Sequence, residues 1–456
     1  MKKVKTNLLL SFLTLMGMCS CTNSSDTKYY SLQIWTYYNG TTETSFQNIV
    51  NEFNETKGKE LKIAVTTQSK GTTVSDLLSA LTNSANNVLG ADAMPDLFLA
   101  YPDTAFELDK LGKVACLNDY FTSEELSNFN DGYLNEGKIG NNDEFKILPV
   151  SKSTEALYIN KTDFDKFIQE NPSLNIHYED LSTIEGLIEV SQKYYQTTGK
   201  AFFGRDSIDN YFVIGAKQLG IDILRYDENG NYGINYDKTV FKKLWDCYYT
   251  PYVKGYFSAT GRFRSDDVKV GNVLAYIGST SSGGYFPSKV ITDSEEHDIE
   301  CKVMVAPTFA SGKKYAVSQG AGFCVSKSNQ GQEKAACEFL KWLSSKDNIT
   351  KFCGSSGYFP ATKDGFTDEF INSQTNVNFK QSFEVAKETT TNYSMYTNII
   401  GENGNSYRNS LKNSLTNIAT EARDAVVKEG MSEESILEYT SETKFEEWFA
   451  SLSSTK

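Results

Sequence analysis

The sequence predicts an α/β protein made of two lobes, and three observations support this prediction. The chain has 456 residues, more than one hydrophobic core usually covers. Its amino-terminal part alternates strand-like and helix-like apolar patterns, the order expected of a largely parallel sheet covered by helices. Residues 147–160 form an extended run longer than an ordinary strand, as a segment that crosses between two lobes would.

The amino-terminal part reads as strand, helix, strand, helix, strand. Residues 31–37 (SLQIWTY) and 61–67 (LKIAVTT) are rich in β-branched and aromatic residues, so we expect strands there. Apolar residues at helical spacing predict helices over 46–53 and 74–88, and the apolar run 97–101 predicts a short buried strand. Ligands bind beyond the carboxyl ends of such strands, which directs attention to the loops near Tyr37, Thr73 and Tyr101.

The rest of the chain continues with both kinds of element. Strands are predicted over 273–278, 302–307 and 315–326, and the first runs into the glycine-rich segment 279–284. Residues 354–360 interrupt the pattern before a helical carboxyl-terminal part. Helical patterns cover 161–170, 181–195, 240–249, 333–343, 407–427 and 433–452.

Composition excludes several classes of function. With 39% hydrophobic and 23% charged residues the chain is globular, and its formal charge of −13 argues against binding to nucleic acid. Only two histidines are present, His177 and His297, so we expect no metal site and no cofactor. Aromatic residues are unusually frequent, with 27 Tyr, 28 Phe and 4 Trp, and any proposed function should use some of these rings.

Residues 1–20 read as a targeting signal. Three lysines precede the apolar run 8–18, which is shorter than the about 20 residues that cross a membrane. The next residues, Met-Cys-Ser-Cys, resemble a bacterial lipobox, and the small Ser20 favours Cys21 over Cys19 as the lipidation site. Residues 21–30 would then be the linker of an extracytoplasmic lipoprotein, held to the cell membrane at the surface or in the periplasm. An ordinary cleaved signal with incidental cysteines is the alternative.

Six further cysteines leave their chemistry open. No pair of them has the C-x-x-C spacing of zinc or thioredoxin-like sites, and an even number in an exported chain permits disulfides. Apolar surroundings equally permit buried thiols. They are Cys116, Cys247, Cys301, Cys324, Cys337 and Cys353.

A set of segments resembles a known family. These segments are 148–161 (LPVSKSTEALYINK), 270–283 (VGNVLAYIGSTSSG), 303–328, 333–352 (EKAACEFLKWLSSKDNITKF), 355–363 (SSGYFPATK) and 404–415 (GNSYRNSLKNSL). Each alone is common, but in this order behind a lipobox they resemble family 1 extracellular solute-binding proteins of ABC importers. That group includes maltose- and glycerol-3-phosphate-binding proteins, and the resemblance spans most of the mature chain.

The resemblance implies a periplasmic-binding-protein-like fold of type II, with a ligand cleft between lobes joined by three crossovers. The crossovers would fall near 149–156, 306–320 and 354–362. Residues 28–152 with 306–357 would form the amino-terminal lobe, and 153–305 with 358–456 the carboxyl-terminal lobe. The implied protein is a monomeric, lipid-anchored carrier without enzymatic activity. It would capture a sugar, oligosaccharide or polyol phosphate by hinge closure and deliver it to the permease subunits.

Three candidate ligand contacts are small residues. Ser153 lies in the first crossover, where a hydroxyl suits hydrogen bonds to a cleft ligand; a serine on a solvated strand face is the alternative. Ser279 opens a glycine-rich turn whose backbone N–H groups could meet a hydroxyl or an anion, although a plain β-turn has the same pattern. Gly320 resembles a position where backbone approaches the ligand closely, and a bulge glycine is the alternative.

Four further candidates have larger side chains. Tyr358, before Pro360, resembles a cleft tyrosine at the third crossover, against the alternative of core packing. Arg408 resembles an arginine that grips a phosphate or hydroxyl groups, against the alternative of a solvated helix charge. Trp35 and Tyr101 end two of the predicted strands and could pack on the apolar face of a sugar.

The sequence departs from the glycerol-3-phosphate-binding branch at informative places. That branch has a tyrosine and a carboxylate where this chain has Thr73 and Pro102, and a tryptophan where residues 202–206 contain none. A carbohydrate-type solute is therefore favoured over glycerol-3-phosphate itself. A surface glycoside hydrolase, using two of the many carboxylates, and a surface adhesin are the competing hypotheses. Neither G-x-S-x-G nor H-E-x-x-H is present, and no repeat suggests an adhesin.

Overall fold

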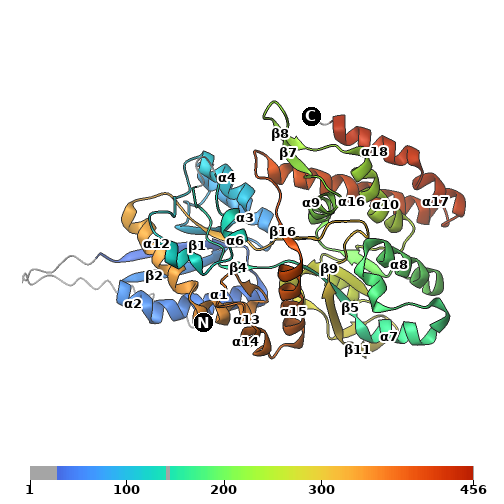
Figure 1. The fold of residues 1–456 in the computed structure, drawn as a ribbon, viewed down its shortest axis with the longest axis horizontal. Coiled ribbons are helices and arrows are strands. Elements are labelled where there is room, and N and C mark those ends of the chain that lie inside the picture. The colour runs from blue at the N-terminus through green and yellow to red at the C-terminus, as the bar shows by residue number, and fades with distance from the viewer. Residues whose placement is uncertain (1–27, 140–143, 455–456) are drawn as a thin grey trace, which may run out of the picture.

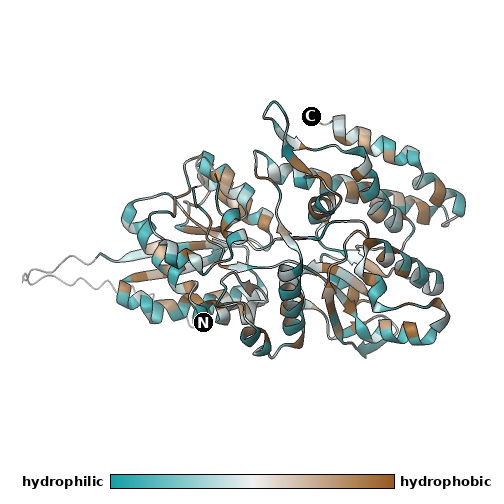
Figure 2. Ribbon diagram, in the orientation of Figure 1, coloured by the Kyte–Doolittle hydropathy of each residue, from teal (hydrophilic) through white to brown (hydrophobic). Residues whose placement is uncertain are grey.

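The computed structural model describes residues 28–139 and 144–454, which form two α/β lobes (Figure 1). The predicted targeting segment 1–20, Cys19, Cys21 and most of the predicted linker 21–30 lie outside the described residues. Within the described part, no helix is both long enough and apolar enough to cross a membrane. Figure 2 shows apolar residues along the strands, while the helices alternate between apolar and polar faces.

The first lobe is built on a four-stranded sheet in the order β14-β3-β1-β2. Strand β1 pairs in parallel with β2 and β3, and β14 adds to β3 in antiparallel orientation. Helices cover both faces, so the neighbours Ile34 and Trp35, which point to opposite faces, are both buried. The strands are β1 (Tyr30–Thr36), β2 (Ile63–Ser69), β3 (Leu97–Ala100) and β14 (Gly322–Val325).

Helices of the first lobe bury one apolar stripe each. Helix α1 buries Phe46, Ile49, Val50 and Phe53, the spacing of one helix face. Helix α3 begins with a capping box in which Thr73 and Asp76 satisfy each other's backbone N–H groups. These helices are α1 (Gly40–Glu55), α2 (Lys57–Leu61), α3 (Val74–Ala85), α4 (Pro102–Lys110), α5 (Ser123–Ser127), α6 (Asp131–Glu136), α12 (Gln330–Leu343), α13 (Lys346–Ser356) and α14 (Asp368–Asn372).

The second lobe contains the sheet β12-β5-β9-β6. Alternate side chains of β5 point to opposite faces of the sheet. Leu157 and Ile159 pack in the large core of this lobe, while Ala156 and Tyr158 pack in a smaller cluster on the other face. The strands are β5 (Glu155–Asn160), β6 (Phe203–Arg205), β9 (Ala275–Ser279) and β12 (Cys301–Val305). Two hairpin-like pairs lie beside it, β7 (Leu224–Tyr226) with β8 (Tyr232–Ile234) and β10 (Lys289–Ile291) with β11 (Glu296–Asp298).

The α-helices of the second lobe range from 6 to 25 residues in length. They are α7 (Lys161–Glu170), α8 (Ile184–Thr198), α9 (Ile208–Gln218), α10 (Lys238–Val253), α11 (Arg264–Lys269), α16 (Gly404–Lys428), α17 (Glu433–Tyr439) and α18 (Glu442–Ser454). A 3₁₀ helix, Thr280–Tyr285, follows β9 directly. Two shorter ones, Pro172–Leu174 and Tyr178–Ser182, connect α7 to α8.

Three chain segments run side by side between the two sheets. Strand β4 (Ser151–Lys152) pairs with β15 (Phe359–Pro360), and Ser153 forms a β-bridge with Gln319. The region predicted as one strand over 315–326 is two strands in different sheets. Its first part is β13 (Tyr315–Val317), which pairs with β16 (Ser394–Tyr396), and its second part is β14. Gly320 separates them with a φ of +95° that favours glycine.

The buried apolar residues form two large cores. The first core is made of two separate chain segments: residues 32–150, with β1–β3 and their helices, and residues 321–386. The resemblance predicts that residues 358–456 belong to the second lobe, but Phe359, Phe370 and Phe383 lie in this first core. Helix α15 (Val377–Asn392) lies between the lobes (Figure 1), with Phe383 in the first core and Val385 in the small cluster beside β5.

Candidate functional site

A cleft of about 730 Å³ is lined by residues of both lobes. From the first lobe come residues after β1, before α3 and after β3, which are carboxyl ends of strands and their loops, where open α/β sheets bind ligands. From the second lobe come the start of α9, residues 262–266, the 3₁₀ helix 280–285 and the start of α16. The volume falls within the roughly 300–1,000 Å³ of small-molecule pockets.

A cluster of four tyrosines forms one wall of this cleft. It consists of Tyr37, Tyr38, Tyr101 and Tyr358, and the ring centroids of Tyr38 and Tyr358 are 6.0 Å apart. The Tyr37 hydroxyl lies near those of Tyr101 and Tyr358 and interacts with both electrostatically. Burial raises the pKa of all four hydroxyl groups, so they stay protonated at neutral pH. The wall therefore offers apolar ring faces edged by neutral hydroxyl groups.

Several buried polar atoms of the cleft residues have no partner among the described residues. They are Ser318 Oγ, Gln319 Oε1, Tyr276 OH and Arg408 Nε. A buried donor or acceptor without a hydrogen bond costs about 1–3 kcal/mol, and native proteins keep few of them. These four atoms belong to residues of one cleft, where a polar ligand would find donors and acceptors without partners among the described residues.

Charged side chains of the cleft are balanced. Arg408 Nη2 donates to Asp209 Oδ2, and both side chains are partly buried. Burial by itself would raise the pKa of Asp209, but the Arg408 guanidinium outweighs it and holds that pKa below its usual value. The cleft is lined by three acidic and three basic side chains, namely Asp206, Asp209, Asp266, Arg262, Arg408 and Lys412.

The two lobes touch each other directly beside the cleft. Arg262 Nη2, before α11, donates to Thr72 Oγ1, before α3, over 2.6 Å. Asn405, in the first turn of α16, donates to Thr104 Oγ1 of α4 over 3.3 Å. Both of these contacts between the lobes are therefore single polar hydrogen bonds.

Asp206 gives the cleft a pH-dependent group. Burial raises its pKa from 3.8 to about 6, against the opposing effect of the Arg264 backbone N–H, which donates to Asp206 over 2.9 Å. The folded protein therefore binds this proton more tightly than the unfolded chain. The resulting stabilisation is complete below about pH 4 and is lost as the pH rises through about 6.

The variant Asp206→Asn, which cannot ionise, should escape this loss. We expect its melting temperature relative to the parent protein to be higher at pH 7.5 than at pH 4.5, as measured by scanning calorimetry. Asp298→Asn, which removes an exposed carboxylate of β11, is the control and should show a smaller pH dependence. A relative melting temperature of Asp206→Asn that rises as the pH falls would contradict this assignment.

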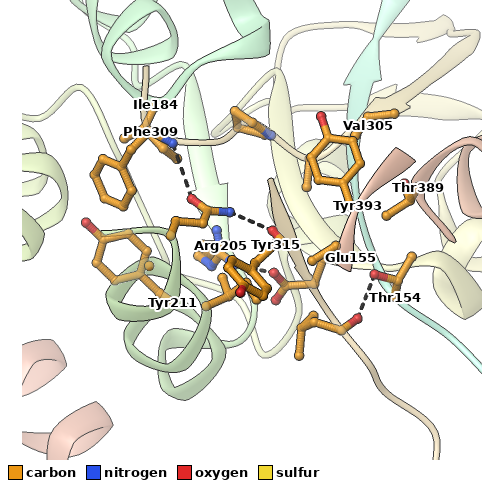
Figure 3. Close-up of a pocket in the computed structure, with 17 residues that line it drawn as sticks. Thr154, Glu155, Ile184, Arg205, Tyr211, Val305, Phe309, Tyr315, Thr389 and Tyr393 are labelled. Atoms are coloured by element: carbon orange, nitrogen blue, oxygen red, sulfur yellow. Dashed lines mark hydrogen bonds and ion pairs between the residues drawn. The ribbon is translucent and has the colours of Figure 1, made fainter. Parts of the chain in front are cut away.

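A second cavity, of about 20 Å³, lies beside the cleft and has room for a water molecule but not for a solute (Figure 3). Glu155 and Arg205 form a buried ion pair at its wall, with side chains 5% and 4% exposed. Asn210 Nδ2 donates to the same carboxylate over 3.3 Å, and Asn210 also lines the large cleft. The pair thus holds the first turn of α9, which carries Asp209 and Asn210, in position under the cleft.

The structure places three of the candidate residues on the cleft wall, namely Tyr101, Tyr358 and Arg408. Gly320 lies directly behind it: its N–H donates to the Tyr101 hydroxyl over 3.3 Å, and a Cβ there would come within 2.8 Å of the Ser151 carbonyl oxygen. Trp35 is 1% exposed, and its indole N–H donates to Gln33.

Ser153 and Ser279 lie next to cleft residues without lining the cleft. Ser153 exchanges two backbone hydrogen bonds with Gln319, of 3.0 and 2.9 Å, and so holds this cleft residue in place. The Ser279 hydroxyl shares a hydrogen bond of 2.8 Å with the hydroxyl of Ser281, which lines the cleft. The sequence therefore predicted that the segments around both serines lie near the cleft. The side chains on the cleft wall are those of their hydrogen-bond partners, Gln319 and Ser281.

Sequence reasoning did not single out several residues of the wall. Tyr37 and Tyr38 had a signal, because Tyr37 ends the predicted strand 31–37, Tyr38 follows it, and loops beyond strand ends bind ligands. Gln319 lies in the predicted crossover 306–320 beside Gly320, whereas Asp209 had no signal, since its partner Arg408 is distant in the chain.

No metal centre emerges from the described ranges: within 28–139 and 144–454 no group of three or more His, Cys, Asp or Glu could hold an ion. The six cysteines in these ranges are free thiols. Burial raises the pKa of Cys301 to about 12, so its thiol is protonated at neutral pH.

The family of bacterial extracellular solute-binding proteins matches residues 48–379. The chain belongs to this family. The match covers β2–β15 and the start of α15, and it includes Tyr101 and Tyr358 of the tyrosine wall, while Tyr37 and Tyr38 precede it. Among curated proteins none matches this solute-binding protein.

Solved structures show the same fold. A substrate-binding protein of Listeria monocytogenes in complex with cycloalternan is 15% identical, with a TM-score of 0.68 over 94% of this chain and 99% of that one. A Mycobacterium tuberculosis protein in complex with glycerophosphocholine is 14% identical, with a TM-score of 0.68 over 93% and 98%. A maltodextrin-binding domain of Bdellovibrio bacteriovorus bound to maltotriose is 14% identical, with a TM-score of 0.64 over 86% and 94%. At these identities the likeness establishes the two-lobed fold.

Proposed function

We propose that this solute-binding protein captures a carbohydrate-type solute (a sugar, an oligosaccharide or a polyol phosphate) and delivers it to the permease of an ABC importer. The observation that carries the proposal is the tyrosine wall facing polar side chains of the other lobe across one cleft. Ring faces pack on the C–H face of a sugar, and unpaired polar atoms such as Gln319 Oε1 and Arg408 Nε satisfy its hydroxyl groups. The ligands named for the structural neighbours include saccharides.

Capture would proceed by hinge closure. The three adjoining segments at β4, β15 and the Ser153–Gln319 bridge support a hinge there, since each runs between the two sheets. Closure brings the tyrosine wall of the first lobe against α9 and α16 of the second, and the Arg262–Thr72 contact forms beside the ligand. A monomer suffices for this mechanism, because one chain supplies both walls.

The function is tested by thermal shift and calorimetry against a panel of neutral saccharides, polyol phosphates and amino acids. A ligand present at 100 times its dissociation constant should stabilise the folded protein by about 2.7 kcal/mol. We expect the saccharides to raise the melting temperature and the amino acids to leave it unchanged. Stabilisation by amino acids alone would contradict the proposal, and turnover of a chromogenic glycoside would indicate a hydrolase instead.

We propose further that Cys21 carries a lipid that tethers the protein to the outer face of the cell membrane, after removal of residues 1–20. The support is the order of basic residues, short apolar run and Ser20-Cys21 in the sequence. The variant Cys21→Ala should lose labelling by radioactive palmitate in growing cells, whereas Cys19→Ala should keep it. Labelling that survives Cys21→Ala and disappears in Cys19→Ala would move the anchor to Cys19.

A further inference from the structure

Arg408, one of the cationic residues that line the cleft, already has an anionic partner within the protein. Its Nη2 donates to Asp209 Oδ2, and Asp209 lines the same cleft from the first turn of α9. The carboxylate of Asp103, which is 3% exposed in α4, also acts on Arg408 electrostatically. An entering phosphate or sulfate would therefore meet a guanidinium whose charge is compensated, with a carboxylate beside it.

The other cations of the cleft are placed in a similar way. Lys412, one helical turn after Arg408 on α16, acts electrostatically on Asp209 as well. Arg262 donates to Thr72 across the cleft and lies near the carboxylate of Asp76. Since three acidic and three basic side chains line the cleft, the cleft as a whole offers an anion no surplus of positive charge.

Arg408 nevertheless keeps hydrogen-bonding capacity for a neutral group. Its Nε is buried and has no partner among the described residues, while its Nη2 is held by Asp209. An N–H donor fixed in direction by an ion pair suits the oxygen of a hydroxyl group. The tyrosine hydroxyls and the unpaired Gln319 Oε1 on the same cleft suit neutral partners too.

We propose that Asp209 is the specificity-determining residue that makes this cleft select uncharged saccharides and reject phosphorylated or sulfated ones. It does so by compensating the charge of Arg408, which turns an anion-binding residue into a donor to hydroxyl groups. This inference rests on the proposed function, because it names the class of carbohydrate that the same cleft takes.

The test compares Asp209→Asn with the parent protein in calorimetric titrations of maltotriose, glycerol 3-phosphate, glucose 6-phosphate and inorganic phosphate. We expect the parent protein to bind the phosphorylated probes weakly and the variant to bind them at least about 10-fold more tightly, because Arg408 becomes free to pair with them. The gain should fall as salt is added. Asp298→Asn removes the same charge from an exposed site on β11 and should give no gain.

A second variant ties the effect to Arg408. In Asp209→Asn combined with Arg408→Gln, the gain in affinity for phosphate should disappear. Asp209→Ser removes the same charge and serves if the asparagine variant fails to fold, which circular dichroism would show. The inference is overturned if Asp209→Asn and Asp209→Ser bind glycerol 3-phosphate no better than the parent protein. It is also overturned if the parent protein binds glycerol 3-phosphate more tightly than every neutral saccharide.

These results separate the inference from the function on which it rests. If neither a saccharide nor a polyol phosphate stabilises the parent protein, the proposed function fails, whereas a gain of phosphate binding in Asp209→Asn still supports charge compensation by Asp209. If saccharides bind and Asp209→Asn gains no affinity for phosphate, only the specificity role of Asp209 fails.

Discussion

Replacing Glu155 with alanine should lower the free energy of unfolding by about 3–5 kcal/mol, since it leaves the Arg205 guanidinium buried without its partner. Asn210 would lose its acceptor as well. Burial raises the pKa of Glu155 even though Arg205 opposes that shift, so the ion pair offsets only part of the cost of burying the carboxylate. Urea denaturation at pH 7, followed by far-ultraviolet circular dichroism, measures the change.

Two controls separate the buried pair from an ordinary ion pair. The double variant Glu155→Met with Arg205→Met replaces both charges by apolar groups of similar length and should recover most of the lost stability. Lys289→Ala breaks an exposed pair with Glu296, whose side chains are 47% and 54% exposed, and should cost less than about 1 kcal/mol. A loss below about 1 kcal/mol in Glu155→Ala itself would show that water replaces the carboxylate in the adjoining cavity.

Replacing Tyr358 with alanine should weaken saccharide binding about 30-fold, or roughly 2 kcal/mol, the effect of removing an aromatic anchor from a buried contact. The ring lies on the cleft wall against Tyr38, and its hydroxyl lies near that of Tyr37. Calorimetric titration with the tightest-binding saccharide of the panel measures the change.

The matched control for this prediction is Tyr358→Phe, which keeps the ring and removes the hydroxyl. Its loss should be a few-fold, since one neutral hydrogen bond contributes about 1 kcal/mol. Equal losses in the alanine and phenylalanine variants would assign the contact to the hydroxyl instead of the ring face. Unchanged affinity in both would remove Tyr358 from the binding site.

Local patterns were sufficient to predict most elements of the fold. The helix predicted over 161–170 is α7 with the same bounds, because Asn160 caps it and Pro172 follows its end. Helix α1 begins at Gly40, ahead of the predicted residue 46, because its first turns are polar and carry no apolar period. The strand predicted over 315–326 is divided, since Gly320 at positive φ sends its two parts to different sheets.

The cleft was predictable where its residues follow strand ends or recognisable segments, as Tyr101, Tyr358 and Arg408 do. The electrostatics of the cleft could not be predicted, because the partner of Arg408 lies 199 residues away and no local pattern marks Asp209. For Trp35, local reasoning predicted a cleft residue where the structure has a core residue. An aromatic residue near a strand end suggests a cleft, but in a sheet covered on both faces the strand side chains are buried on either side.

The assembly of the first core from residues 32–150 and 321–386 has a consequence for biogenesis. Strand β3 cannot gain its edge neighbour β14 on the ribosome until the whole second sheet has been made, and the second core waits in turn for α16–α18. The first half therefore waits for residues 321–386 and the second half for the last helices, unlike domains that are continuous in sequence. A polypeptide whose apolar surfaces stay unpaired until late in synthesis remains competent for passage through a narrow export channel.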